Sequence, residues 1–414
     1  LFNKFIPTPP KSTDNPNINL MDFGDRLFAL TEATFISEVK PDSLSVKDKT
    51  DLKDYLPLHL STAHPHKLKD GTMIFFGTNM NYKNAYNFIE IPPPADPSEN
   101  PFAAAKIVAT VPSRWKMNIS YTHSFGLTEN YFVHLEQPLT ANLPLVFFQK
   151  PLGKRFADVL TVHEGQSMDI MLVDRATGKR HPITYEAPEG MAFHFINSYE
   201  EADHVVCDIC FKPKGALAVY HAYLHIMAED LKKRESDNEP SYFARFVLPL
   251  SIEGAEAGKN LVTLPNTTAT ATLREGSKTV VSVTPEIIKD GMTADFPGIN
   301  YSYNGMKYRY CYTCTALATI NRNLAKFDLV EKRVLTYDVG DDHQVGEPVF
   351  LARPGATRED DGVVLSTMIA FNSSVQSYLV ILDAITFTEI ARASLPSEMK
   401  MTFTFHGMFS DKIL

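Results

Sequence analysis

The sequence has little of what marks several large classes of protein. Four cysteines in 414 residues are too few for the disulfide framework of a small secreted scaffold. The longest apolar run, residues 143–148, falls well short of the roughly 20 residues that cross a bilayer. Lysine and arginine number 40 against 49 aspartates and glutamates, which leaves no basic surface for collecting phosphates. These absences argue against a disulfide-rich protein, a membrane-spanning protein and a nucleic-acid partner.

Several familiar short motifs are missing as well. There is no Walker loop, no G-x-G-x-x-G after a strand, no G-x-S-x-G elbow and no H-E-x-x-H, so the enzyme classes that these motifs define are disfavoured. The first residues lack the basic start and apolar core of a signal peptide, and the chain begins with Leu1 rather than Met. We expect a cytoplasmic protein that is not secreted, with its natural N-terminus upstream of Leu1.

Period-two hydrophobic patterns dominate what is present, and they predict β-strands. They lie at residues 72–77, 131–135, 167–174, 204–211, 326–338, 363–371, 378–383, 389–395 and 401–405. The 27 prolines and 20 glycines punctuate these runs as turn residues do. Only residues 223–234 show a helical pattern. Many short strands, with no literal repeat and no linker, favour one all-β domain over residues 1–414, which is a sandwich, a barrel or a diverged propeller.

Two Cys-x-x-Cys pairs, Cys207/Cys210 and Cys311/Cys314, have a spacing that is used to bind zinc. However, residues 205–211 have the pattern of a strand, in which residues three apart point to opposite faces. Both cysteines of a pair then cannot grip one ion from a straight segment. We therefore interpret all four as small buried apolar residues.

Histidine is the most informative residue type. Four of the 13 histidines, His64, His123, His194 and His406, sit in short and mostly apolar strings. A lone histidine among aromatic residues is more often a hydrogen-bonded core residue than a ligand, but four in similar settings favour a shared role. Because they lie far apart in the chain, they meet only if different sheets converge on one axis, as the inner strands of propeller blades do.

Longer strings around these histidines resemble the carotenoid cleavage oxygenase family. Within it the chain is most similar to the animal branch, which holds carotenoid 15,15′-oxygenases, insect-type isomerooxygenases and retinoid isomerohydrolases. The matching strings are Thr-Ala-His-Pro-His at 62–66, and residues 123–128, 193–200, 260–271, 359–366 and 405–407. The resemblance runs from about Phe2 to Phe409 and involves several independent motifs.

The resemblance implies a seven-bladed β-propeller with one Fe(II) on its central axis and a helical and loop cap over one face. It also implies that His64, His123, His194 and His406 bind the iron, with O2 as co-substrate. Relatives carry a further N-terminal segment that supplies most of the first blade, so we expect this blade to be incomplete here. Four neutral imidazoles leave the full charge on the ion and open positions for O2.

The resemblance further places carboxylates behind three of the histidines. The matching positions are Glu32, Asp295 and Glu359, which would accept the second N–H of each imidazole and fix its tautomer and angle. Asp295 stands where relatives usually carry glutamate. Its shorter arm leaves open whether it reaches its histidine, expected to be His194, directly or through a bridging water.

The substrate that the resemblance implies is a carotenoid of the β-carotene, zeaxanthin or lutein type, and its polyene requires an apolar tunnel. The candidates for lining this tunnel are Thr31, Phe193, Phe195, Tyr220 and Phe296. An apolar segment with basic residues after it is a candidate for docking on a membrane, although an ordinary strand is an equally good interpretation. Its expected membrane-facing residues are Leu143, Leu145, Val146, Phe147 and Phe148. The animal relatives are peripheral membrane proteins, which favours docking.

These implications define one expected function and two alternatives. We predict an oxygenase that splits the central 15,15′ double bond of a carotenoid with O2 into retinal-type aldehydes, with isomerisation of one half to the 11-cis form. The first alternative is a retinoid isomerohydrolase that acts on all-trans-retinyl esters and uses the iron as a Lewis acid. The second is a carotenoid-binding propeller without catalysis. The sequence does not indicate the oligomeric state.

Overall fold

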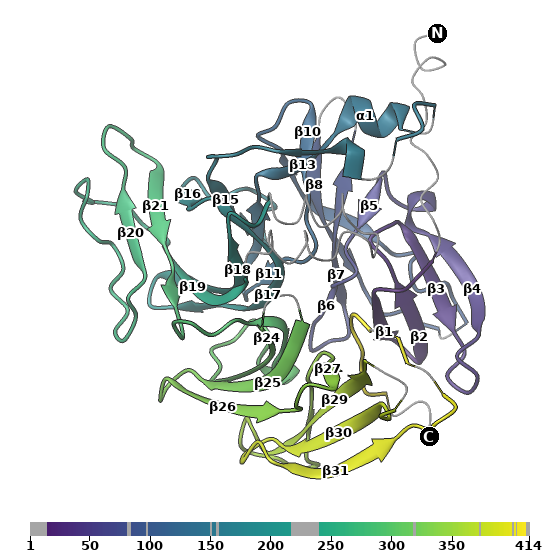
Figure 1. Cartoon of the computed structure of the whole chain (residues 1–414). Helices are drawn as coiled ribbons and strands as arrows, with labels where there is room; N and C mark the ends of the chain where they lie inside the picture. Colours follow the sequence, from purple (N-terminus) through teal and green to yellow (C-terminus); the bar gives the residue numbers. More distant parts are fainter. Residues whose placement is uncertain are drawn as a thin grey trace.

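The sheets of the protein are arranged around a common centre, as the cartoon of Figure 1 shows. The computed structural model describes residues 15–80, 84–96, 98–149, 151–154, 157–216, 240–317, 320–371, 374–399, 401–402 and 404–410. Within these residues there are seven sheets, and six of them have four or more strands. This architecture is a β-propeller, so the predicted all-β class is confirmed.

The first half of the chain forms the sheets on one side of the centre. One sheet contains β1 (Asn19–Phe23), β2 (Arg26–Leu30), β3 (Phe35–Val39) and β4 (Val46–Asp51). The next contains β5 (Leu60–Ser61), β6 (His66–Lys67), β7 (Met73–Asn79), β8 (Ala85–Ile91) and β9 (Lys106–Pro112). A three-stranded sheet is made of β10 (Asn118–Ser120), β13 (Leu139–Asn142) and β14 (Leu160–Val162).

The remaining sheets complete the arrangement in chain order. The largest contains β11 (Gly126–Leu127), β12 (Tyr131–Glu136), β15 (Met168–Asp174), β16 (Thr184–Ala187), β20 (Thr270–Leu273) and β21 (Val280–Thr284). Then come β17 (Gly190–Glu201), β18 (His204–Pro213), β19 (Tyr242–Pro249) and β22 (Glu286–Ile287). The last two sheets contain β23 (Asp295–Gly298), β24 (Tyr310–Leu317), β25 (Ile320–Asp328) and β26 (Arg333–Asp338), and β27 (His343–Val345), β28 (Val349–Ala352), β29 (Gly362–Ala370), β30 (Tyr378–Asp383) and β31 (Glu389–Ser394).

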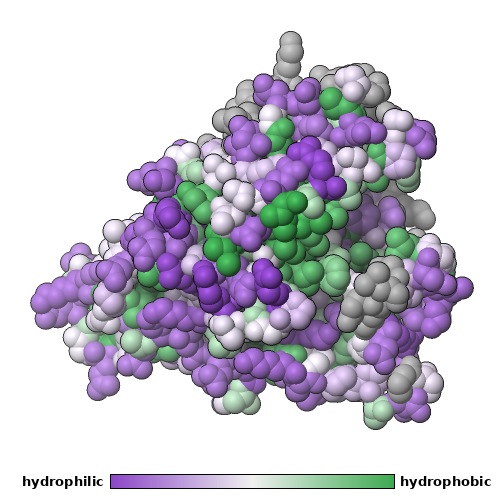
Figure 2. Space-filling view, turned by 90° about the horizontal axis from the view of Figure 1, so that it is seen from below, coloured by the Kyte–Doolittle hydropathy of each residue, from purple (hydrophilic) through white to green (hydrophobic). Residues whose placement is uncertain are grey.

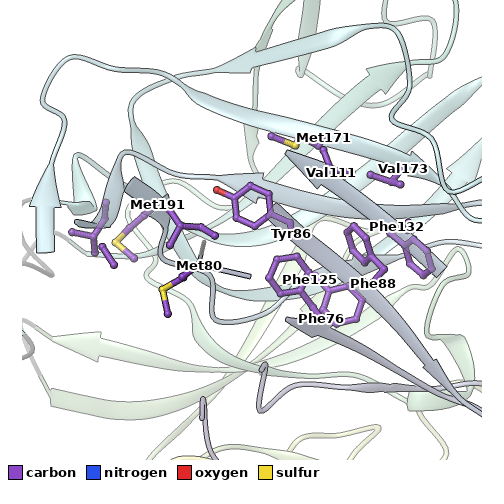
Figure 3. Close-up of a cluster of buried hydrophobic side chains, with 14 of the residues drawn as sticks. Phe76, Met80, Tyr86, Phe88, Val111, Phe125, Phe132, Met171, Val173 and Met191 are labelled. Atoms are coloured by element: carbon purple, nitrogen blue, oxygen red, sulfur yellow. The ribbon is translucent and has the colours of Figure 1, made fainter. Parts of the chain in front are cut away.

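The hydrophobic core lies between neighbouring sheets. In the cluster drawn in Figure 3, aromatic side chains from β7 and β8 meet those from β12 and the segment before β11. Phe88 and Phe132, both fully buried, stack with their ring centroids 4.4 Å apart. Burial of large aromatic rings is a major source of hydrophobic stabilisation, so these contacts hold one sheet against the next.

The inner strands approach one another closely near the centre, and glycine permits this approach. A Cβ atom on Gly126 would lie 2.4 Å from Ser198 Oγ, and one on Gly298 would lie 2.2 Å from the carbonyl oxygen of Pro348. Each contact joins segments of two different sheets. A side chain at either position would therefore push the sheets apart.

Most of the predicted strands are found, with two corrections. Residues 378–383 coincide with β30, and 131–135 with most of β12. Residues 326–338 are the end of β25 and all of β26, because a turn with Lys332 at a φ of 49° separates them. Within 401–405 the described residues form no strand.

Helix is scarce in the described residues. The one α-helix, α1 (Leu143–Phe148), begins at Asn142, whose side chain accepts the N–H of Leu145, and short 3-10 turns occur at Leu52–Asp54, Ala157–Val159 and Tyr301–Tyr303. The predicted helix at 223–234 lies outside the described residues. In the part of the chain that is described, no helix has the length and apolar character needed to span a membrane.

The four cysteines are buried thiols without disulfide bonds. Cys207 packs in a core cluster with Phe246, whereas Cys210 packs in another with Phe243. The two therefore point to opposite faces of β18, as the strand pattern predicted. Burial raises the pKa of both thiols, which makes them poor nucleophiles and poor zinc ligands.

The outer strands of the sheets carry polar side chains. All but the last two residues of β4 are exposed, as are all but the first of β31. Hydrophilic side chains cover most of the face shown in Figure 2, with apolar ones gathered near its middle. Charged side chains on exposed edges oppose strand pairing between molecules.

Candidate metal centre

The four predicted histidines meet at the centre of the propeller. His64 lies between β5 and β6, His123 between β10 and β11, His194 within β17 and His406 in the C-terminal segment. One ring nitrogen from each histidine lies within 4.8 Å of those of the other three. The Nε2 atoms of His64 and His123 are 2.8 Å apart, and those of His194 and His406 are 3.3 Å apart.

A local irregularity of β17 shapes the site around His194. The pairing of β17 with β18 shifts register between Ala192 and Phe195 and again between Phe195 and Asn197. Bulges of this kind bend a strand and redirect its side chains. As a result Phe193 and Phe195, two residues apart, do not share one face as they would in a regular strand.

Three of the histidines have a carboxylate behind the ring. The Nδ1 atom of His123 pairs with Glu32, His194 Nδ1 lies 2.6 Å from Asp295 Oδ1, and His406 Nδ1 lies 2.8 Å from Glu347 Oε1. A carboxylate at Nδ1 holds the proton on that nitrogen and leaves the Nε2 lone pair for a metal. No carboxylate within the described residues bonds to the ring of His64.

The structure differs from the prediction at Glu359. Its carboxylate accepts the backbone N–H groups of Arg309 and Tyr310 and so anchors the start of β24; it bonds to no histidine in the part of the chain that the structure describes. Glu347, just after β27, is instead the third carboxylate behind a histidine, His406. Sequence reasoning missed Glu347 because nothing in the string Gly346-Glu347-Pro348 signals where its side chain points.

Each carboxylate has a further anchor that sequence reasoning did not identify. The Tyr121 hydroxyl donates to Glu32, the Ser241 hydroxyl donates to Asp295 Oδ2 at 3.0 Å, and the Gly407 N–H donates to Glu347 Oε2 at 3.0 Å. These bonds fix the angle at which each carboxylate meets its imidazole. Hydrogen-bonded carboxylates behind metal-binding histidines are typical of built metal sites.

Asp295 reaches His194 directly, without a bridging water. Phe296, the next residue, has a φ of 48°, and its N–H donates to Asp295 Oδ1 at 2.9 Å. A phenylalanine in the left-handed region is uncommon and strained. The pairing of β23 with β24 is irregular between Asp295 and Gly298, and from this irregular strand the shorter aspartate side chain reaches the ring.

Burial favours neutral imidazoles at the centre. Burial, with smaller contributions from the other histidines, holds the pKa of His64 well below its ordinary value. Burial also lowers the pKa of His194 to about 4, although Asp295 opposes this shift. Burial alone would raise the pKa of Asp295, but its contacts with His194 and the Phe296 N–H lower it to about 2. His64 and His194 are thus held as neutral rings, and the carboxylate behind His194 is held ionised.

The donor set fits a divalent metal ion. The N–H groups of His194 and His406 point at carboxylates, so both Nε2 atoms present lone pairs to each other at 3.3 Å. Two facing lone pairs repel unless a cation lies near them. Four neutral nitrogen ligands suit iron, copper, nickel or zinc, so the chemistry of the four rings is that of a metal site.

The predicted substrate residues fall into separate groups. The Phe193 ring lies 5.4 Å from that of His123, and the Phe296 ring lies 5.2 Å from His194 and 5.4 Å from His406, centroid to centroid. Phe195 instead lines a cavity on the axis, whereas Thr31 is not among the residues that line it. Tyr220 lies outside the described residues.

The predicted membrane segment is α1, so the interpretation of this segment as a strand is wrong. Leu143 is buried, Leu145 is half-buried, and Val146 and Phe147 pack partly against the core between β7 and β12. Phe148 is 47% exposed. Of the five residues, Phe148 thus offers the most surface to a membrane.

Four histidines face the axis of this β-propeller, and a carboxylate contacts three of them. This fold and this site together define a class of propeller proteins with a metal site on the axis. The family model described as retinal pigment epithelial membrane protein matches residues 4–411. The chain belongs to this family of carotenoid oxygenases, which confirms the resemblance seen in the sequence.

Curated relatives match over nearly the whole chain. It is 32% identical over 416 residues to the human beta,beta-carotene 15,15'-dioxygenase, covering 99% of this chain and 75% of the relative. The same enzyme from Gallus gallus is 34% identical over 417 residues, with 99% and 77% covered. The mitochondrial carotenoid-cleaving dioxygenase of Mustela putorius furo is 32% identical over 408 residues, with 97% and 75% covered.

Solved structures confirm the fold. The cobalt-substituted apocarotenoid oxygenase of Synechocystis superposes with a TM-score of 0.72 at 20% identity, covering 97% of this chain and 75% of that one. A chimera of that enzyme with RPE65 gives a TM-score of 0.72 at 21% identity, with 95% and 74% covered. At these sequence identities the similarity supports a shared fold and nothing further.

Proposed function

We propose that the protein is a non-haem iron dioxygenase that cleaves a carotenoid at its central 15,15′ double bond. One oxygen atom of O2 goes to each of the two carbons, so that one carotenoid gives two retinal-type aldehydes. The observation that carries this proposal is the convergence of four histidine rings, with carboxylates behind three of them, in a chain 32% identical to a named carotenoid dioxygenase. Fe(II) held by His64, His123, His194 and His406 would supply the electrons that activate O2.

The residues around the histidines hold the site in one geometry. Glu32, Asp295 and Glu347 accept the Nδ1–H groups, which keeps the Nε2 lone pairs directed at the centre. Removal of such a partner commonly lowers metal affinity or activity by about 10–100-fold. The three carboxylates also offset part of the positive charge that an ion would bring into a buried site.

Aromatic rings provide an apolar surface beside the histidines. Phe193 packs edge-on against His123 and lies 6.0 Å from the ring of Tyr121, while Phe296 lies against His194 and His406. A polyene has no polar group along its chain, so a site for it must consist of surfaces of this kind. We propose that Phe193 and Phe296 contact the carotenoid and keep water from it.

We further propose that the protein takes its substrate from a membrane surface. The Leu152 N–H donates to the Phe148 carbonyl, and the Met117 carbonyl accepts the N–H of Leu143 at the start of α1. The side chains of Leu152 and Met117 are 56% and 57% exposed. Lys116 directly precedes Met117 in the chain, and Lys154 lies two residues after Leu152. Exposed apolar side chains with basic neighbours suit an anionic bilayer surface.

Product analysis tests the function. The iron-loaded protein is given β-carotene or zeaxanthin in detergent under O2, and the products are separated by chromatography that resolves geometric isomers. Aldehydes of half the carotenoid length are expected, and an 11-cis half among them shows that cleavage is coupled to isomerisation. All-trans aldehydes alone contradict the isomerisation. If no carotenoid is cleaved, retinyl esters are the next substrate to supply, and failure with both leaves a binding protein.

A further inference from the structure

A cavity of about 460 Å³ lies on the propeller axis beside the histidines. His64, His194 and His406 form part of its wall. The other lining residues come from stretches of chain around the whole axis, at 19–22, 64–67, 124–127, 194–198, 297–299, 347–351 and 406–409. Because every side of the axis contributes, this cavity is the central channel of the propeller and not a gap between two sheets.

The cavity extends from the histidines in one direction. Where the lining comes from the chain around the histidines, it comes from the residues that follow them, at 65–67, 124–127, 195–198 and 407–409. The residues just before two of these histidines, Tyr121 and Phe193, do not line it and pack together beside His123. The chain before Tyr121 leads back to β10, next to α1. The cavity therefore leaves the site on the side away from Phe193 and α1.

The wall of the cavity is mostly apolar, with polar side chains such as Asn197 and Asn304 among its lining residues. Val349 and Leu351 alternate with Phe350 on β28, are half-buried, and belong to no core cluster, whereas Phe350 packs on Tyr312. Lys67 and Asp22 also line the cavity, and Lys67 Nζ lies 3.1 Å from Asp22 Oδ2. Apolar cavities in proteins take up small apolar molecules such as xenon or benzene.

We propose that this axial cavity is the path by which dioxygen reaches the metal, separate from the path of the carotenoid. The inference rests on the proposed function, since it is O2 that the reaction requires. Dioxygen is small and apolar, so it enters a cavity with such a wall at little cost in free energy. A carotenoid ring would have to lie against the partly exposed Lys67–Asp22 ion pair and take water from these charges, which costs free energy.

Separate paths have a consequence for the order of binding. A carotenoid seated against Phe193 and Phe296 leaves the axial cavity open, so O2 reaches the metal after the carotenoid has bound. The polyene then excludes water from one side of the site, while the second substrate arrives from the other.

The test fills the cavity and measures how fast a diatomic gas reaches the metal. Val349→Trp and Leu351→Trp place a large side chain in the channel, and Ile390→Trp, at a position 59% exposed on β31 of the same sheet, is the matched control. Nitric oxide, a stable analogue of O2 at ferrous iron, is mixed with each Fe(II)-loaded protein in a stopped-flow instrument. Iron content and carotenoid affinity are measured in parallel.

We expect the rate of nitric oxide binding to fall by about tenfold or more in the two channel variants and to stay unchanged in Ile390→Trp. Iron content and carotenoid affinity should be unchanged in all three. Equal rates in all three overturn the proposal. If the tryptophan variants fail to fold, crystals of the unaltered protein under xenon decide, because xenon beside Val349 supports the path and an empty channel contradicts it.

The outcomes separate this inference from the proposed function. Nitric oxide binding needs no carotenoid, so slow binding in the channel variants together with no cleavage of any carotenoid would leave the gas path standing and refute the dioxygenase. Cleavage of carotenoid with unaltered nitric oxide rates would do the reverse.

Discussion

Two buried histidines, His194 on the axis and His134 between two sheets, show what distinguishes a metal ligand from a core residue. Both are nearly inaccessible, with 6% and 1% of their surface exposed. His194 has Asp295 on one ring nitrogen and three other histidines facing the second. His134 on β12 has no hydrogen-bond partner for either nitrogen within the described residues. Burial alone therefore does not make a ligand.

The surroundings of His134 explain why it is tolerated. Its ring lies 4.9 Å from Phe76 and 4.2 Å from Tyr86, centroid to centroid, so it fills space among aromatic rings. Burial, with a smaller contribution from Arg180, lowers its pKa to about 3. His134 thus acts as a neutral aromatic side chain, whereas the axial histidines are oriented donors.

The sharpest way to test this contrast is to remove one histidine of each kind. His123→Ala and His406→Ala should each lose the bound iron and all detectable cleavage, because the remaining nitrogens no longer enclose the ion. His134→Phe should keep one iron per chain and its activity. Iron is measured by mass spectrometry and folding by circular dichroism. Full iron in either axial variant would refute the ligand assignment.

A second test compares two glutamates, one at the axis and one away from it. Glu347→Gln should lower iron affinity or turnover by about 10–100-fold, since His406 loses its carboxylate partner. Glu359→Gln should leave iron affinity unchanged, because within the described residues its carboxylate accepts hydrogen bonds from the backbone N–H groups of Arg309 and Tyr310 and from no histidine. Competition with a chelator gives both affinities. The opposite ranking would restore the prediction made from the sequence.

The pH dependence of the stability of the metal-free protein tests whether the fold holds the His134 ring neutral. Its folded pKa of about 3 lies below the ordinary value near 6.5, so the unfolded chain binds one more proton between these values. Stability conferred by the neutral ring is therefore present above pH 6.5 and is lost as the pH falls toward 3. The loss amounts to about 1.4 kcal/mol per pH unit.

His134→Phe removes this titration, so its urea midpoint should fall less steeply than that of the unaltered protein between pH 6.5 and 4.5. Both proteins are measured without metal so that the axial histidines contribute equally. Parallel curves would show that His134 is not held neutral in the fold.

The smallest effect is expected at Asp295. Asp295→Glu should keep iron and most of its activity, within about fivefold of the unaltered protein, because a carboxylate still accepts the His194 N–H. Steady-state turnover at saturating carotenoid measures this. Complete loss of turnover with iron still bound would give Asp295 a role beyond orienting its histidine.

The strands and the four axial histidines could be predicted from the sequence because local residue patterns signal both. Alternating apolar residues define β30 and β12, and the strings around the histidines match the family. Glu347 could not be found in this way, since its role depends on how the chain after β27 turns toward the C-terminal segment.

Phe195 shows a second limit of sequence reasoning. Its spacing from Phe193 predicts a shared face, but the bulges of β17 separate them, so that Phe193 packs by His123 and Phe195 lines the axial cavity. A bulge depends on pairing with the neighbouring strand, which a single strand's pattern does not contain.

X-ray absorption at the iron edge of the Fe(II)-loaded protein reports the atoms bound to the metal, so it shows whether the four axial histidines hold the iron. We expect scattering from four imidazole rings and none from sulfur, with the imidazole contribution reduced in His406→Ala if any iron remains. Sulfur ligands, or two or fewer imidazoles, would contradict it.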